Sequence, residues 1–374
     1  MPEYPVRKNP KKIIAATAVV VVVFVATYGI VTWWKPTFVV YTYSGFMDWG
    51  DEGASAVLKR AFAPFEKKYG INIQFIDLQG DTSFLVSRLN AEKSNPVADV
   101  VIGLDNIIVL QENARSVLEP YISPSLKYIN QSLVDTLDPD HYLTPFDFGL
   151  VTLIYSMNKI NETSYPQIGN LTFADLASNE LASSLVTEDP RFSSPGLAFF
   201  LSEIAVYKKL LNEDWTSWWN DVEGKIDVEQ GWSQAWSTWS TSPTRNLLVS
   251  YGTDPAYSAS YTNSTPDIAV APLYYEGKPW AWMQVEGVGL VKNGPHPDLG
   301  KAFIDYCLNI TVQQEIPLNQ WMFPVRTDLT LPNVFQYAIH PDEISILNSL
   351  LNSTEIRTNI QDWLDEYTAV MTPG

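Results

Sequence analysis

Strands and helices alternate along residues 37–113, and this alternation constrains the fold more than any other feature of the chain. Apolar and polar residues alternate along 71–78, 98–104 is a short apolar run, and apolar residues recur at helical spacing in the segments between the strands. We predict strands at 37–43, 71–78 and 98–104, and helices at 53–70, 81–93 and 106–113. A β-α-β-α-β order predicts a mostly parallel sheet with right-handed crossovers.

A second α/β unit is predicted to begin after the apolar segment 143–157. Its elements are expected as strands near 184–187, 246–251 and 267–273, and helices near 195–211, 214–221 and 232–240. A strand near 283–292 leads back toward the first lobe, and helices are expected after it at 297–309, 341–352 and 355–370. We assign 37–146 to a first lobe and 147–273 to a second, with about 274–374 returning to the first. Two such lobes joined by crossing segments place a ligand cleft between them, at the carboxyl ends of the strands.

The N-terminal segment 13–34 carries no charge and predicts a transmembrane anchor. At ~1.5 Å per residue a helix of this length crosses a hydrocarbon layer ~30 Å thick. Lys8, Lys11 and Lys12 precede it, so the positive-inside rule keeps the basic tail 1–12 in the cytoplasm. Cleaved signal peptides have a shorter apolar region of ~7–15 residues. We therefore predict an uncleaved, single-pass anchor, with the body on the extracytoplasmic side of the cell membrane.

Six N-x-[ST] sequons agree with an exported body and predict a glycoprotein. The sequons begin at Asn130, Asn161, Asn170, Asn263, Asn309 and Asn352. We expect Asn309 to be the least accessible, because its flanking residues look buried.

The chain is strongly acidic, with 24 basic and 42 acidic side chains and a formal net charge of −18. Such a charge repels phosphate, so we expect no nucleic-acid partner, whereas cationic ligands are compatible with it. Cys307 is the only cysteine, which excludes an intrachain disulfide. We expect Cys307 to be a small buried residue.

Catalytic motifs are scarce. His141, His296 and His340 are the only histidines, and no two of them are spaced as metal ligands. The chain has no G-x-S-x-G, H-E-x-x-H or P-loop motif. Glu276 and Glu286 remain candidates for a two-carboxylate hydrolase, because spacing alone does not exclude one. We predict a protein that is not an enzyme and that has no resident metal or cofactor.

Aromatic residues gather at loop junctions, beside Gly, Pro, Ser and Asp. They are Trp49, Trp232, Trp236, Trp239, Tyr251, Tyr257, Trp280, Trp282 and Trp321. Tyr41 and Tyr43 share one face at the end of the first strand, so Tyr43 falls where the cleft is expected. Each ring alone can belong to the core. As a group beside turn residues they indicate a stacking site for a flat or cationic ligand.

Two predicted helix starts offer free backbone N–H groups. Ser193 and Ser194 precede Pro195, a favoured first-turn residue, and Gly80 lies ahead of the helix at 81–93. The helix dipole and the free N–H groups favour a phosphate or carboxylate at such positions. Ordinary helix capping is the alternative at both.

The chain resembles the thiamine-binding receptors of ABC importers, within the larger group of two-lobed extracytoplasmic solute-binding proteins. The resemblance rests on eight segments that run in family order and cover essentially all of 37–326. The segments are "VYTYSGFMDWG", "ADVVIGLDN", "TPFDFGLVTLIY", "EDPRFSSPGL", "EQGWSQAW", "LLVSYGTDPAY", "QVEGVGLV" and "IPLNQWMFPV". The resemblance implies an α/β, type II periplasmic-binding-protein-like fold. It also implies a monomer that captures thiamine or a thiamine phosphate and delivers it to a permease with its ATPase.

Site residues follow from these motifs by resemblance. Tyr43, Tyr257 and Trp321 would pack against the pyrimidine and thiazolium rings, with Asp48 and Trp49 nearby. The residues implied to hold the hydroxyethyl or phosphate end are Gly80, Asp81, Ser193, Ser194, Trp232, Tyr251, Gly252, Thr253 and Asp254.

Three features depart from the family pattern, and one of them is the predicted membrane anchor, since the family pattern is a freely diffusing receptor. The family's Asp-Gly before the second helix is Gly80-Asp81 in this chain, and Asp254 stands where the family commonly has serine. A carboxylate at 254 would repel a phosphate, which favours free thiamine. Two alternatives stay open: a related receptor for an iron complex, sulfate or a polyamine, and an anchored carbohydrate-active enzyme.

Overall fold

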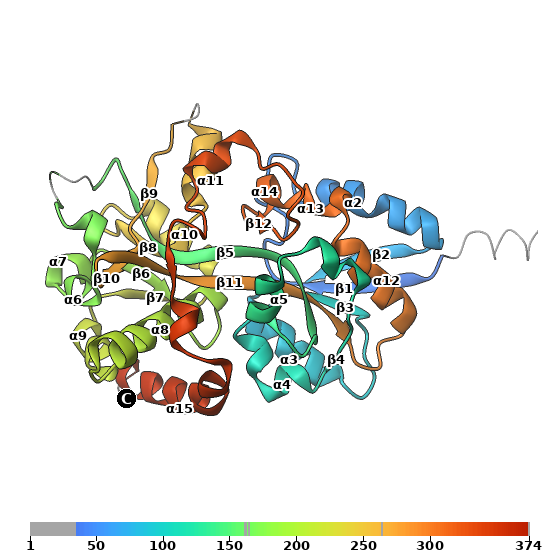
Figure 1. Cartoon of the computed structure of the whole chain (residues 1–374), viewed down its shortest axis with the longest axis horizontal. Helices are drawn as coiled ribbons and strands as arrows, with labels where there is room; N and C mark the ends of the chain where they lie inside the picture. Colours follow the sequence, from blue (N-terminus) through green and yellow to red (C-terminus); the bar gives the residue numbers. More distant parts are fainter. Residues whose placement is uncertain (1–34, 161–162, 164, 263–264, 373–374) are drawn as a thin grey trace, which may run out of the picture.

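Two long strands, β5 (Leu143–Ser156) and β11 (Lys278–Val291), cross the middle of the molecule and join its two halves (Figure 1). The computed structural model describes residues 35–160, 163, 165–262 and 265–372. The two long strands pair antiparallel at the centre of one continuous sheet, whose order is β2-β1-β3-β11-β5-β8-β6-β7. We call the half that contains β1–β3 the first lobe and the half that contains β6–β8 the second lobe.

The first lobe has a parallel sheet edge with helices on both faces. Its main elements are β1 (Thr37–Thr42), α2 (Ala54–Tyr69), β2 (Asn72–Asp77), α3 (Thr82–Glu92), β3 (Val100–Asp105) and α12 (Pro297–Cys307). Side chains alternate along β1, so Phe38 packs under α2 and α12 while Tyr41 packs on the α3 side. Gly70 ends α2 in the left-handed conformation, at φ 67°, and its N–H bonds Glu66 O.

The second lobe repeats this plan around a more buried helix. Its main elements are β6 (Leu185–Glu188), α8 (Ser194–Ala205), α9 (Thr216–Val222), β7 (Asp227–Glu229), α10 (Trp232–Thr241), β8 (Leu247–Tyr251) and α11 (Asp254–Tyr261). Helix α8 is buried along its whole length, as its apolar sequence requires, and continues as a π-helical segment, Val206–Leu211. Its first residues lie at the junction of the two lobes.

Shorter elements complete the chain. They are the 3-10 helices Ile108–Leu110, Pro124–Tyr128, Ile168–Asn170, Asn333–Tyr337 and Leu347–Leu350, the helices α4 (Glu112–Arg115), α5 (Gln131–Leu137), α6 (Phe173–Leu176), α7 (Asn179–Ala182), α13 (Ile310–Gln313), α14 (Ile316–Asn319) and α15 (Ser353–Met371), and the strands β4 (Leu118–Glu119), β9 (Ile268–Val270), β10 (Leu273–Tyr275), β12 (Phe323–Pro324) and β13 (Ser345–Ile346). Helix α15 packs on α9 through a Trp219–Tyr367 ring contact of 4.8 Å, so the last helix lies against the second lobe. The predicted lobe boundaries stay a prediction.

The parallel sheet predicted from residues 37–113 is confirmed for β1, β2 and β3. Strands β11 and β5 run antiparallel to each other and to their outer neighbours β3 and β8, so the sheet as a whole is mixed. Two helix expectations are wrong. The helix expected at 106–113 is a 3-10 turn followed by the short α4. The helix expected at 341–352 is instead β13 and a 3-10 turn. There Asn348 bonds both the N–H and the carbonyl of Met283, and these contacts with β11 outweigh the local helical spacing.

Other expectations fall partly outside the described residues. The tail 1–12, the anchor 13–34 and the sequons at Asn161 and Asn263 lie there. Within the described part of the chain, no helix combines the length and apolar character needed to span a bilayer. Cys307 is buried, as predicted.

The expectation of buried flanks at Asn309 holds on one side only. The preceding residue, Leu308, is buried, whereas the next residue, Ile310, is 45% exposed. Asn309 itself is exposed, and its side chain caps α13 by accepting the Thr311 N–H.

Candidate ligand-binding site

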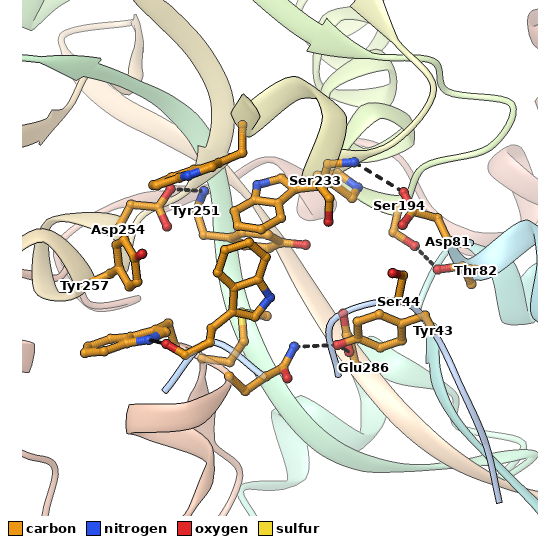
Figure 2. Close-up of a pocket in the computed structure, with 17 residues that line it drawn as sticks. Tyr43, Ser44, Asp81, Thr82, Ser194, Ser233, Tyr251, Asp254, Tyr257 and Glu286 are labelled. Atoms are coloured by element: carbon orange, nitrogen blue, oxygen red, sulfur yellow. Dashed lines mark hydrogen bonds between the residues drawn. The ribbon is translucent and has the colours of Figure 1, made fainter. Parts of the chain in front are cut away.

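A cavity with about 770 Å³ of empty space lies between the lobes (Figure 2). The lining residues are Tyr43, Ser44, Trp49, Asp81, Thr82, Ser194, Pro195, Trp232, Ser233, Trp236, Tyr251, Asp254, Tyr257, Glu286, Gln320, Trp321 and Met322. Both lobes contribute, together with the crossing strand β11 and the segment after α14.

Tyr43 follows β1 and is held by three other segments of the chain. Its hydroxyl donates to Glu286 Oε2 at 2.9 Å and accepts from Gln320 Nε2 at 2.6 Å. Its ring lies against Gly103, where an added Cβ would stand 2.2 Å from Tyr43 Cδ1. Gly103 also has a φ of +106°, which side-chain-bearing residues rarely adopt. The ring position therefore depends on glycine at 103.

A chain of touching rings forms one side of the cavity. Trp49 of the first lobe meets Trp232 of the second edge-on, with ring centroids 4.8 Å apart. Trp232 and Trp236 lie one turn apart on α10, and Trp236 meets Tyr257 edge-on at 5.5 Å. Tyr257 in turn meets Trp321 edge-on at 5.3 Å. These rings present both faces and edges to a planar ligand.

Three carboxylates line the same cavity: Asp81, Asp254 and Glu286. Burial raises the pKa of Asp254 to about 7, although the Ser250 hydroxyl and the Tyr251 N–H both donate to it. Burial also raises the pKa of Asp81.

Glu286 faces a second buried acid across the sheet. It lies directly opposite Asp147 on the paired strands β11 and β5, where the register shifts at a bulge. Burial and the neighbouring Asp147 raise the pKa of Glu286 well above its usual range. Burial raises the pKa of Asp147 to about 8, and both of its carboxylate oxygens lack a hydrogen-bond partner. Ionising either of these two carboxyl groups therefore costs free energy.

No lysine, arginine or histidine lines the cavity among the residues that the structure describes. An anionic ligand would therefore meet carboxylates with no cationic side chain to balance it. A cation would lower the cost of ionising Asp81, Asp254 and Glu286 and would find aromatic faces to pack on.

The lobes touch at the polar end of the cavity, beside Asp81 in Figure 2. Thr82 Oγ1, at the start of α3, lies 2.6 Å from Ser194 Oγ, at the start of α8. Ser194 donates to the buried carboxylate of Asp105, which also accepts the N–H groups of Ile107 and Ile108 at 2.7 and 2.8 Å. The hydroxyl that joins the lobes is thus held by an internal acid.

Nine of the fourteen residues singled out from the sequence line this cavity. They are Tyr43, Trp49, Asp81, Ser194, Trp232, Tyr251, Asp254, Tyr257 and Trp321. Their proximity is a structural observation, and their contact with a ligand stays a proposal.

The other five residues singled out do not line the cavity. Asp48 instead caps α2, where its Oδ1 accepts the Ala54 N–H at 2.7 Å. Ser193 and Thr253 are buried in the second lobe, and Gly252 is bonded through its backbone to Leu150. Gly80 lines a smaller hollow nearby, which shares Ser44, Asp81 and Ser233 with the cavity.

Sequence reasoning missed several lining residues or gave them another role. The sequence predicts no specific site role for Trp236, although its spacing of four residues from Trp232 places both side chains on one face of α10. Glu286 was a candidate only for acid–base chemistry. It does not pair with Glu276, which lies in the β10–β11 turn at the other end of β11. Ten strand residues span about 33 Å, far beyond the carboxylate separation of a glycosidase.

Known solute-binding proteins resemble this chain in sequence and in fold. The chain is 28% identical over 335 residues to the thiamine-binding periplasmic protein of Escherichia coli K12, covering 89% of this chain and 93% of that protein. A solved periplasmic thiamin-binding protein superposes with a TM-score of 0.74 at 26% identity, covering 90% of this chain and 97% of that one. The ferric-binding protein of Campylobacter jejuni, at 18% identity and a TM-score of 0.69, shares the fold, covering 89% and 99%.

The fold type predicted from the sequence, a two-lobed periplasmic-binding-protein architecture of type II, is confirmed by these structures. The model of the bacterial extracellular solute-binding proteins matches residues 49–314, well over half of the chain. Proteins of this kind are solute receptors of ABC importers and not enzymes. The chain belongs to the family of bacterial extracellular solute-binding proteins.

Proposed function

We propose that the protein captures thiamine between its lobes and delivers it to an ABC permease. The observation that carries this proposal is the cavity itself, which combines several aromatic faces with three carboxylates. Thiamine has a flat, permanently cationic thiazolium ring and a second flat ring, so both kinds of lining group have a counterpart in it. The thiamine-binding relatives support the same ligand.

Tyr43, Tyr257 and Trp321 are the rings that we expect to pack on the ligand. They come from the first lobe, the second lobe and the segment after α14. A ligand that contacts all three favours the state in which they are close together. Capture therefore needs no chemical step, because binding itself favours the closed form that the permease receives.

Delivery from the cell surface is the second part of the proposal. We propose that 13–34 anchors the receptor beside its permease, and that the body is extracytoplasmic, monomeric and glycosylated at some of its sequons. Carbonate extraction of membranes tests the anchor: the full chain should stay with the membrane, and a chain lacking residues 1–34 should be released. Release of both would refute the anchor without bearing on the ligand.

The binding test uses the full 374-residue chain in a mild detergent. Isothermal titration calorimetry with thiamine should show saturable binding at one site. Tryptophan emission should change in parallel, because Trp49, Trp232, Trp236 and Trp321 line the cavity. Ferric citrate, sulfate and maltose serve as negative ligands. A correctly folded chain that shows no binding of thiamine would refute the proposal.

A polyamine is the second candidate, because three carboxylates and many rings also suit a flexible polycation. Spermidine discriminates between the two in the same titration. A flat ligand would stack on the rings around Tyr257. The affinity of a polyamine would instead come mainly from ion pairs with Asp81, Asp254 and Glu286. Tighter binding of spermidine than of thiamine would favour this second function.

A further inference from the structure

We propose that the cavity accepts unphosphorylated thiamine and rejects its phosphate esters. The inference rests on the proposed function, and it assigns the charge of the ligand's tail. It follows from the groups that occupy the polar positions of the cavity.

Four helices begin at the cavity wall, and a carboxyl group lies at or beside the start of each. At α3, Asp81 directly precedes the first residue. At α8, the Ser194 hydroxyl donates to Asp105. At α10, the Trp232 N–H points to Asp81 Oδ2 at 3.4 Å. At α11, the first residue is Asp254 itself. Helix starts are the usual positions for a bound phosphate, but each of these four has an acidic side chain beside it.

The donors beside Asp254 are also committed. Its Oδ2 accepts the Tyr251 N–H at 3.2 Å and the Ser250 hydroxyl. Ser250 in turn accepts from Trp232 Nε1 at 2.9 Å. A phosphate at this end would have to displace a buried carboxylate from its donors and lie beside it.

Cationic side chains near the cleft are paired elsewhere. Arg191, in the loop before α8, bonds Asp189 through Nε at 2.8 Å and does not line the cavity. Arg60 of α2 is paired with Glu315 at 2.8 Å and with Glu52. Within the described residues, the cavity therefore has no charge to balance a phosphate.

The tail of free thiamine ends in a hydroxyl group, which suits the same positions. A hydroxyl can donate to a carboxylate such as Asp81 or Asp254 without bringing charge into the cavity. A phosphate monoester carries about −1.5 to −2 charges at neutral pH. Its entry would require desolvation of that charge next to like charges, which is among the costliest changes in a buried site.

The test compares thiamine, thiamine monophosphate and thiamine diphosphate by calorimetry on the full chain in detergent at pH 7.5. We expect the monophosphate to bind on the order of 100-fold more weakly than thiamine, and the diphosphate no better. A ratio of tenfold or more supports the inference, and a smaller ratio overturns it. Absence of thiamine binding would instead refute the proposed function, and the inference with it.

Variants identify the cause of the discrimination. Asp81→Asn and Asp254→Asn each remove one negative charge and keep a polar group of the same shape. We expect each to narrow the ratio of thiamine to monophosphate affinity by about tenfold. Asp135→Asn, on the exposed surface of α5, makes the same charge change away from the cavity and should leave the ratio unchanged. An unchanged ratio in both cavity variants would contradict the assigned cause.

Discussion

The hydroxyl groups of Thr82 and Ser194 lie 2.6 Å apart, one at the start of α3 in the first lobe and the other at the start of α8 in the second. Ser194 donates to Asp105, so Thr82 is the donor between the two hydroxyls. This contact exists only when the lobes are close together. This contact between the lobes lies at the edge of the cavity where the ligand is expected, so it can stabilise the closed form around the ligand.

Thr82→Val should shorten the lifetime of the complex. Valine keeps the shape of threonine and removes only the hydroxyl, so the closed state loses one hydrogen bond worth about 0.5–1.5 kcal/mol. We expect thiamine to dissociate roughly 2- to 12-fold faster, measured by stopped-flow tryptophan fluorescence. Thr358→Val, on the exposed face of α15, is the matched control. Equal dissociation rates in both variants would show that this contact does not hold the lobes together.

Gly103→Ala should displace the Tyr43 ring and weaken binding. The new Cβ would stand 2.2 Å from Tyr43 Cδ1, and the φ of +106° adds backbone strain. We expect an unfolding free energy lower by more than about 1–2 kcal/mol and thiamine affinity lower by about tenfold or more. Chemical denaturation and calorimetry measure the two effects.

Gly70→Ala is the control that separates the strain from the clash. Gly70 also has a positive φ, of +67°, but nothing lies within 4 Å of its added Cβ. This variant should lose about 1 kcal/mol of stability and no affinity. An affinity loss of the same size in both variants would exclude a specific effect on Tyr43.

Local patterns predicted much of the fold because they depend on neighbouring residues. The apolar spacing of α2 and the glycine at 70 are sufficient to place that helix and its end. The error at 341–352 has the opposite origin, since Asn348 bonds Met283, which is 65 residues away. The antiparallel pairing of β5 with β11 likewise joins segments that no local pattern relates.

The site shows the same division. Rings beside turn residues, such as Tyr257 and Trp321, are visible in the sequence as candidates. The role of Gln320 is not, because it bonds the Tyr43 hydroxyl across 277 residues. Asp81 and Asp254 are visible in the sequence as site residues. The contact of Asp105 with Ser194 is not, because the two meet only through the packing of two lobes.

Loss of a ring face from the cavity should weaken thiamine binding. Tyr257→Ala and Trp321→Ala each remove one stacking surface, which we expect to cost about 1–3 kcal/mol of binding free energy. Tyr257→Phe keeps the ring and removes only the hydroxyl, so its affinity should stay close to that of the unmodified chain. Calorimetry measures all three. Unchanged affinity in both alanine variants would reject the placement of the ligand against these rings.

Thiamine affinity should rise as the pH is raised from about 6 to about 8. Burial raises the pKa of Asp254 to about 7. A bound cation stabilises the ionised carboxylate, so this pKa is lower in the complex than in the free protein. The corresponding part of the affinity is complete above the free pKa and is lost as the pH falls through it.

Asp254→Asn tests the assignment, because other ionisable groups surround Asp254. Glu188 lies at the end of β6, Asp81 at the start of α3 and Glu286 on β11, and Tyr251 and Tyr257 are its neighbours in the chain. The variant removes one titration and leaves the others, so its affinity should change less between pH 6 and 8. Asp135→Asn should keep the full pH dependence, measured by calorimetry in buffers of matched ionic strength. A slope that Asp254→Asn leaves unaltered would assign the pH dependence to another carboxylate of the cavity.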